Sequence, residues 1–175
     1  IATSGIYHMS VNGKFVCYGP ARAGRGFFRV DEIDLTPFAD REQNTVIIEV
    51  CGYNARSYYL IKQDSFLTAE LLTDGQVAAY TGNDFTARIN PEYIKKIQRY
   101  SFQRPFAESY RVIAGDTYFT DTVQGTEPLS YLPQPKYLKR STPYPLYEKT
   151  GAKRILGGTF SFSERDEYWR NGAFD

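Results

Sequence analysis

The chain has 175 residues, a formal net charge of +1 and an apolar content of 42%. This length and composition indicate a globular protein with room for one β-domain and additional material, or for two small domains. The nearly neutral charge argues against a nucleic-acid-binding protein, which needs a concentrated basic face. No apolar run approaches the roughly 18 residues of a membrane span, so neither nucleic acid nor a membrane is an expected partner.

The first predicted element is a β-hairpin that turns at Asn12-Gly13. This dipeptide favours a two-residue turn, and apolar stretches flank it on both sides. A ladder without irregularities would place Tyr7 opposite Tyr18. The expected inward face consists of Tyr7, Met9, Val11, Val16 and Tyr18. The expected outward face consists of Ile6, His8, Ser10, Phe15 and Cys17.

A glycine-rich loop is predicted over residues 19–26, and residues 27–30 resume an extended conformation. Residues 34–38 then indicate a strand that runs into a short helical turn. Thr36 can cap this turn, and Pro37 suits the first helical position because its missing N–H would have no partner there.

The clearest central strand covers residues 45–53, where β-branched residues alternate and Glu49 on the other face argues against complete burial. A second hairpin follows, with strands at residues 66–72 and 77–81 joined by a turn at Asp74-Gly75. One more strand is predicted at 85–89, which gives six or seven strands at a spacing typical of a β-sandwich.

The pattern changes after this strand-rich region. Asn90 begins a short predicted helix, and residues 99–112 are expected to be extended or irregular. Residues 126–147 contain five prolines, which exclude regular helix and central strands. This part of the chain is therefore expected to be a linker, or an ordered arm that lies over a surface.

Cys17 and Cys51 both lie in predicted strands. They are interpreted either as buried thiols or as a disulfide across adjacent strands, which would indicate an oxidising compartment. Two cysteines and one histidine cannot form a closed zinc site of the usual Cys/His kind.

A series of short segments occurs in a fixed order along the first half of the chain. They are Gly5-Ile6-Tyr7, Val11-Asn12-Gly13, Gly19-Pro20, Arg29-Val30-Asp31, Asp34-Leu35-Thr36, Asn44-Thr45-Val46-Ile47, and Phe66-Leu67-Thr68-Ala69-Glu70-Leu71 with Asp74-Gly75. This order resembles the N-terminal β-sandwich modules of bacterial α-L-rhamnosidases and related multidomain glycoside hydrolases, and residues 98–108 resemble the segment that leads into their next domain. Where such enzymes often carry Gly-Trp, this chain has Tyr53-Asn54-Ala55-Arg56.

The resemblance implies an all-β fold, an antiparallel jelly-roll β-sandwich of the galactose-binding-like class over residues 1–90. Its first strands would precede Ile1 in a longer parent protein. Residues 91–125 would connect toward a second β element, and residues 126–175 would form an irregular, Pro-rich and aromatic extension or linker.

The function implied by the resemblance is that of a non-catalytic accessory module that supports a downstream catalytic domain and binds a plant or bacterial oligosaccharide. No two carboxylates have a spacing that predicts a glycosidase cleft, so no catalytic residue is expected and the chain alone is expected to be inactive. Two alternatives stay open: a module that contributes residues to the parent's active site, and a protein-interaction sandwich unrelated to sugars. A periplasmic, cell-surface or secreted location is favoured over a cytoplasmic one.

Two groups of residues are candidate sites. Asn54, Arg56, Tyr58 and Tyr59 follow the central strand on a predicted loop and could bind sugar hydroxyls and the apolar face of a sugar ring. Alternatively, the tyrosines pack on the sandwich and the arginine pairs with an acid. Asp31 and Asp34 belong to an acidic cluster that could hold a structural calcium ion, or could serve as surface charge and as a cap. No other cofactor is expected.

Overall fold

The computed structural model describes residues 1–40, 42–53, 55–56, 58, 61–87, 90, 92–94, 97, 101, 103, 106–107, 109–111, 136–148, 151, 154 and 157–159. The chain divides into a compact unit, Ile1–Pro143, and a second unit, Tyr144–Asp175. All the strands named below lie in the first unit. In the second unit, the described residues form neither helix nor strand.

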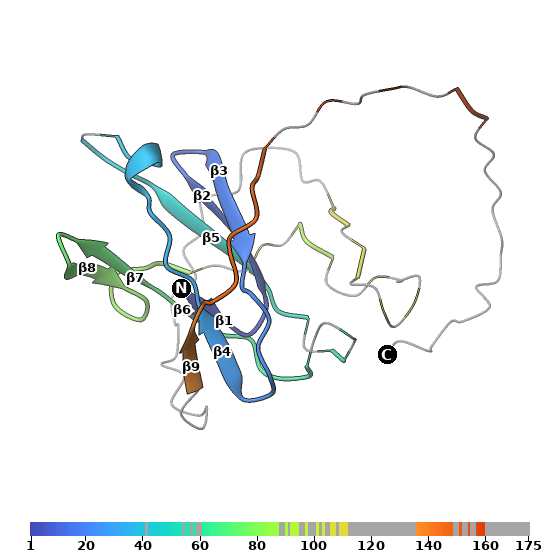
Figure 1. Ribbon diagram of the computed structural model, residues 1–175, viewed down its shortest axis with the longest axis horizontal. Helices are drawn as coiled ribbons and strands as arrows, with labels where there is room; N and C mark the ends of the chain where they lie inside the picture. The colour runs from blue at the N-terminus through green and yellow to red at the C-terminus, as the bar shows by residue number, and fades with distance from the viewer. Residues whose placement is uncertain are drawn as a thin grey trace. The chain divides into compact units, whose positions relative to one another are not determined.

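The described part of the chain is built from short strands and one turn of 3₁₀ helix (Figure 1). The elements are β1 (Ala2–Thr3), β2 (Ile6–Val11), β3 (Lys14–Gly19), β4 (Phe27–Val30), η1 (Thr36–Phe38), β5 (Val46–Cys51), β6 (Leu67–Thr68), β7 (Glu70–Thr73), β8 (Gln76–Tyr80) and β9 (Lys136–Lys139). They pair as β1-β6, β3-β2-β5, β4-β9 and β7-β8, and only β4-β9 is parallel. The predicted all-β, mainly antiparallel class is therefore confirmed.

The core lies against one face of the three-stranded sheet, whose strands run side by side in blue and cyan in Figure 1. Tyr7, Met9 and Val11 alternate along β2 and are each 1% exposed. Val46, Ile48 and Val50 of β5 and residues of the segment around η1 pack against them. Full burial of one apolar side chain of this size contributes about 1.5–3 kcal/mol, so packing on this face stabilises the described region.

The predicted turn of the first hairpin is confirmed, but the predicted register is wrong beyond the first two pairs. Asn12 and Gly13 have positive φ angles of 51° and 73°, as the turn between two twisted strands requires. Ser10 pairs with Phe15, yet Met9 pairs with Cys17, so Val16 is an extra residue that forms a β-bulge.

The bulge exchanges two side chains between the faces of the sheet. Cys17 is buried at 4% exposure and Val16 beside it at 9%, while Tyr18 is 52% exposed. Tyr18 was expected inside opposite Tyr7 and Cys17 outside, and both positions are reversed. Since side-chain direction alternates strictly along a regular strand, one inserted residue is sufficient to cause this reversal.

Asn12 also connects the hairpin turn to the segment between η1 and β5. Its backbone N–H donates to the Thr45 carbonyl at 2.9 Å, and its Oδ1 accepts from the Thr45 N–H at 2.9 Å. Its Nδ2 lies 3.0 Å from the carbonyl oxygen of Phe38, 3.1 Å from Oδ2 of Asp40 and 2.9 Å from Oδ1 of Asn44. The residue that forms the turn therefore also anchors the start of the neighbouring strand.

The second hairpin has the same kind of turn and the same kind of β-bulge as the first. Asp74 and Gly75 have φ angles of 52° and 76°, and Leu72 pairs with Val77 while Leu71 pairs with Ala79. The extra residue is the third after the turn glycine, the same offset as in the first hairpin. The predicted turn at Asp74-Gly75 is thus confirmed, with a bulge that the alternation did not indicate.

Two further local predictions differ from the structure. Phe85 and Thr86 have no regular structure, Ala87 forms a β-bridge, and residues 88 and 89 of the strand predicted at 85–89 lie outside the described residues. Instead of a helix after Asn90, Tyr93 forms an isolated β-bridge with Tyr110, and the Ile94 N–H donates to the Ser109 carbonyl at 2.9 Å. The turn predicted at Thr36 and Pro37 is present as η1, but its N-cap residue is Leu35 rather than Thr36, and Leu35 makes no side-chain cap hydrogen bond.

The two cysteines are free. Cys17 lies on β3 and Cys51 on β5, and β2 runs between these two strands. Two strand spacings amount to roughly 10 Å, which exceeds the Cα separation that a disulfide can bridge. The alternative of a disulfide across adjacent strands is therefore excluded by the strand order.

Part of the segment predicted as a Pro-rich extension pairs with the strand-rich region. β9 lies parallel to β4, with Phe27 opposite Lys136 and Val30 opposite Lys139. Its parallel pairing adds an edge strand, the kind of position that a proline-rich neighbourhood allows. The domain boundaries predicted at residues 90 and 125 stay predictions.

Candidate functional site

The residues predicted to bind calcium lie in different surroundings. Asp31 is 2% exposed, and its two carboxylate oxygens are engaged by Tyr7 and Arg140. Asp34 is exposed and accepts a hydrogen bond from the Thr36 N–H at 2.9 Å. Hydrogen bonds from Thr36 lower the pKa of the Asp34 carboxyl below its usual range. Among the described residues, no three or more His, Cys, Asp or Glu side chains gather as metal ligands would.

The predicted sugar-binding loop is described only in part. Asn54 and Tyr59 lie outside the described residues. Arg56 is exposed, and Tyr58 is 70% exposed. These two positions are compatible with contacts to a ligand, and the role of the loop stays a prediction.

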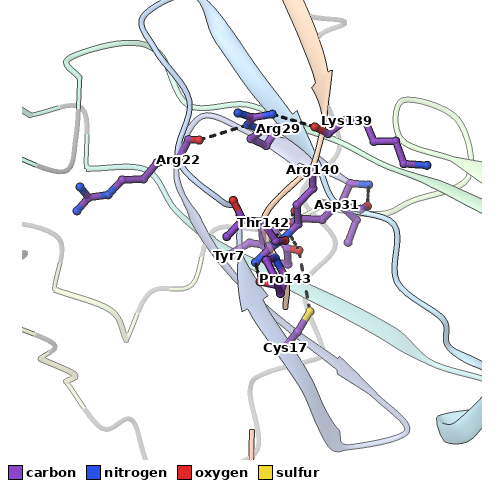
Figure 2. A network of polar contacts seen from close by, with 10 residues as sticks. Tyr7, Cys17, Arg22, Arg29, Asp31, Lys139, Arg140, Thr142 and Pro143 are labelled. Atoms are coloured by element: carbon purple, nitrogen blue, oxygen red, sulfur yellow. Dashed lines mark hydrogen bonds and ion pairs between the residues drawn. The ribbon is translucent and has the colours of Figure 1, made fainter. Parts of the chain in front are cut away.

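A buried polar network connects β2, the end of β4 and the residue after β9 (Figure 2). The Tyr7 hydroxyl donates to Oδ2 of Asp31 at 2.7 Å, and Nη1 of Arg140 lies 3.0 Å from Oδ1. The side chains of Arg140 and Asp31 are 8% and 0% exposed. Arg140 also donates from Nε to the Thr142 carbonyl at 2.7 Å and from Nη2 to the Pro143 carbonyl at 3.0 Å.

The surroundings of this network are closely packed. A Cβ atom at Gly19 would collide with the ring of Tyr7 and with Oδ2 of Asp31, so a glycine is needed there. The Cys17 thiol lies 4.0 Å from the Tyr7 hydroxyl, as a weak donor to it. Burial raises the pKa of Cys17, and burial together with the hydrogen bond to Asp31 raises the pKa of Tyr7 far above its ordinary value.

This arrangement is a set of buried, charge-matched and hydrogen-bonded groups. The Asp31 carboxylate is matched by a guanidinium and a hydroxyl, and the raised pKa values keep Tyr7 and Cys17 protonated at neutral pH. A nucleophile or general base would need the opposite setting, a lowered pKa or an open approach for a substrate.

The opposite face of the three-stranded sheet carries a compact group of rings, His8, Phe15 and Tyr18, which we call the outer aromatic cluster. The ring centroids of His8 and Phe15 are 5.4 Å apart and nearly parallel at 15°, and those of Phe15 and Tyr18 are 4.9 Å apart. His8 and Tyr18 are 5.3 Å apart. Phe15 and Tyr18 are 37% and 52% exposed.

A carboxylate borders the outer aromatic cluster. Glu49 of β5 is the register partner of His8, and its Oε2 lies 2.9 Å from Nδ1 of His8. The side chains of His8 and Glu49 are 36% and 40% exposed, so both polar groups remain within reach of solvent. The result is an apolar aromatic surface with hydrogen-bonding groups at its edge.

Only part of the outer aromatic cluster was predicted from the sequence. His8 and Phe15 were expected on the outward face, and the structure places them there. Tyr18 was assigned to the inward face, because nothing in the alternation indicated the bulge at Val16. The position of Glu49 on the less buried face of the central strand was the available signal for its proximity to His8.

Comparisons of the chain with models of known protein families, with curated proteins and with solved structures gave no match. In the part of the chain that the structure describes, no helix has the length and apolar character needed to cross a membrane.

Proposed function

We propose that this chain is a non-catalytic accessory module that binds carbohydrate through the outer aromatic cluster. In this proposal its strands belong to a β-sandwich of the galactose-binding-like class, in an α-L-rhamnosidase-like glycoside hydrolase. The catalytic domain of that parent chain is its structural partner, and a plant or bacterial oligosaccharide is its ligand. The family assignment rests on the sequence resemblance and on fold-level analogy.

The observation that carries the proposal is the exposure of Phe15 and Tyr18 next to a carboxylate. One face of a pyranose ring is apolar and stacks on aromatic rings, while the hydroxyls at its edge need hydrogen-bond partners. Phe15 and Tyr18 supply the rings, and Glu49 supplies acceptor oxygens beside them through its contact with His8. The rings are held by a sheet rather than by a loop, which reduces the ordering cost of binding.

The same chemistry supports binding rather than hydrolysis. Glycoside cleavage requires two carboxyl groups on either side of the scissile bond, about 5–9.5 Å apart. Glu49 interacts with His8 at the outer aromatic cluster, and the buried Asp31 is neutralised by Arg140. In this proposal the outer aromatic cluster is a recognition surface, and the reaction takes place in another domain of the parent chain.

The predicted loop adds a second contact region to the proposal. Arg56 and Tyr58 are exposed and follow β5, the strand that carries Glu49. We include Asn54 and Tyr59 as predicted members of this loop. A structural calcium ion bound by Asp31 is disfavoured because both carboxylate oxygens already have partners, and Asp34 alone offers too few oxygen ligands.

A protein-interaction module is the second candidate, and the β7-β8 hairpin is the observation that favours it. Leu72, Val77 and Tyr80 are 57%, 53% and 47% exposed on this hairpin. Exposed apolar side chains that gather on one element are typical of protein-binding surfaces. This candidate predicts binding that depends on the hairpin and not on Phe15 or Tyr18.

Titration with sugars distinguishes the two candidates. The chain is titrated with rhamnose, galactose and plant oligosaccharides, and binding is followed by calorimetry and by backbone NMR shifts. Saturable binding that Tyr18→Ala or Phe15→Ala weakens, and that Tyr80→Ala leaves intact, supports the proposal. Tyr80 is a matched control because it is an exposed tyrosine on a different sheet. Binding that is unaffected by both cluster variants, or no binding to any of these sugars, would reject it.

A further inference from the structure

The segment of residues 136–143, which we call the C-terminal arm, is held by the rest of its unit in the way that a bound peptide is held. It contributes an added strand, β9, to the edge of β4 and one buried side chain, Arg140. None of its residues belongs to the core cluster around Tyr7 and Met9. These features set the arm apart from the strands that build the core.

Main-chain contacts fix the position of the arm along β4. The Lys136 N–H donates to the Gly26 carbonyl at 3.4 Å, and the Arg140 N–H donates to the Val30 carbonyl at 3.2 Å. Arg29 of β4 donates from Nη1 to the Lys139 carbonyl at 2.9 Å (Figure 2). Addition of an extended strand to a sheet edge is a recurring mode of peptide recognition, in which side-chain pockets supply the specificity.

Specificity depends mainly on the buried Arg140, and the two lysines of the arm add exposed contacts. Arg140 enters the buried site formed by Asp31 and Tyr7. Lys139 pairs with Glu32 at 3.2 Å in an exposed position, and the Lys136 ammonium lies 5.3 Å from the centroid of the Phe27 ring. Of these contacts, the buried one dominates because exposed ion pairs contribute little.

Hydrogen bonds within the arm hold part of its conformation. Arg140 donates to the carbonyls of Thr142 and Pro143, so the chain curls around its own guanidinium. These contacts are local in sequence, so a separate peptide of these residues contains the groups that form them. A segment that adopts such a conformation before binding loses less conformational entropy on binding.

We propose that the edge of β4, together with Asp31 and Tyr7, is a strand-acceptor site that binds an extended basic segment of the type Lys-x-x-Lys-Arg. Its occupant in this structure is the C-terminal arm, and the site accepts the same segment in trans. The proposal is independent of carbohydrate binding, because the outer aromatic cluster lies on the face of the sheet opposite Tyr7.

The test uses the full chain with its own arm weakened by Arg140→Ala and a fluorescent peptide that spans residues 135–144. Fluorescence anisotropy measures binding of this peptide, of the same peptide carrying Arg140→Ala, and of one carrying Lys139→Ala. We expect the arginine peptide to bind at least about tenfold more tightly than its alanine version, because charge-assisted hydrogen bonds to a buried group contribute about 1.5–3 kcal/mol. The Lys139→Ala peptide should bind within about threefold of the unmodified one.

A second variant of the chain is used if the Arg140→Ala chain does not fold. If Arg140→Ala lacks native β-structure by circular dichroism, Arg140→Lys replaces it, since lysine keeps a positive charge near Asp31. Adding Asp31→Asn to either chain should abolish the preference for the arginine peptide. The proposal is overturned if the unmodified peptide shows no saturable binding to a folded variant, or if the Arg140→Ala peptide binds equally well.

Discussion

Arg140 and Asp31 form a buried ion pair although 109 residues separate them in the sequence. The guanidinium reaches a carboxylate whose second oxygen accepts the hydroxyl hydrogen of Tyr7. The pair connects the residue after β4 with the residue after β9 in addition to the backbone pairing of these strands. The predictions below begin with this pair.

Replacing Arg140 by methionine should lower the free energy of unfolding by about 3–5 kcal/mol, because it leaves the Asp31 carboxylate buried without a cation. Urea denaturation followed by circular dichroism measures the change. The double variant with Asp31→Asn should lose less than the sum of the two single variants, since neither charge then remains.

Lys139→Met is the matched control for this experiment. Its ammonium is one residue away, but its pair with Glu32 is exposed, with side-chain exposures of 78% and 70%. We expect a change of no more than about 1 kcal/mol. Equal losses for Lys139→Met and Arg140→Met would contradict the importance of the buried pair.

Tyr7 should make the protein sensitive to alkali. Its pKa is raised by burial and by Asp31, while an unfolded tyrosine titrates near 10. The unfolded chain therefore loses a proton that the folded chain keeps, so the stability is complete below about pH 10. Above that pH, it falls by up to about 1.4 kcal/mol per pH unit for this group.

Tyr7→Phe removes the titrating hydroxyl and should flatten the decline between about pH 10 and 11. At neutral pH the variant should be about 1 kcal/mol less stable, because Asp31 loses a hydrogen bond. Urea denaturation at several pH values measures both effects. Parallel curves for the two proteins above pH 10 would show that Tyr7 does not cause the decline.

Asn12 should stabilise the folded chain through its side-chain hydrogen bonds as well as through its turn conformation. Asn12→Ala loses both the side-chain hydrogen bonds and the tolerance of a positive φ, whereas Asn12→Gly loses only the hydrogen bonds. We expect alanine to cost roughly 1 kcal/mol more than glycine, and glycine itself about 1–2 kcal/mol. Thermal and urea unfolding measure these differences.

Asp74→Gly provides the comparison for Asn12→Gly, since Asp74 has nearly the same φ angle at the equivalent turn position of the second hairpin. We expect it to change stability by less than about 0.5 kcal/mol. A loss at Asp74→Gly as large as that at Asn12→Gly would contradict a specific contribution of the Asn12 side-chain hydrogen bonds.

The two thiols should differ in reactivity. Cys17 is 4% exposed and its pKa is raised by burial, which disfavours the reactive thiolate, whereas Cys51 is only partly buried. Alkylation of the native chain with iodoacetamide at pH 8, read by mass spectrometry, should modify Cys51 first. In urea both should react, and early modification of Cys17 in the native chain would contradict its placement.

Local turn chemistry was readable from the sequence, and long-range pairing was not. Asn12-Gly13 and Asp74-Gly75 predict their turns because few residues accept two successive positive φ angles. The bulges depend on which side chains the core accepts, and alternation alone cannot reveal them. Asp31 was predicted to be a calcium ligand or a surface charge, because the cation that neutralises it occurs far later in the chain.

The outer aromatic cluster exists because β3 carries one residue more than a regular ladder requires. With regular pairing, Tyr18 would turn toward the core and the Cys17 sulfur would be displayed beside His8. Which side chains this face of the sheet exposes thus depends on whether β3 contains the extra residue. Gain or loss of a single codon in β3 would change that surface more than most point substitutions, so strand length is the character to compare when this surface is traced among related sequences.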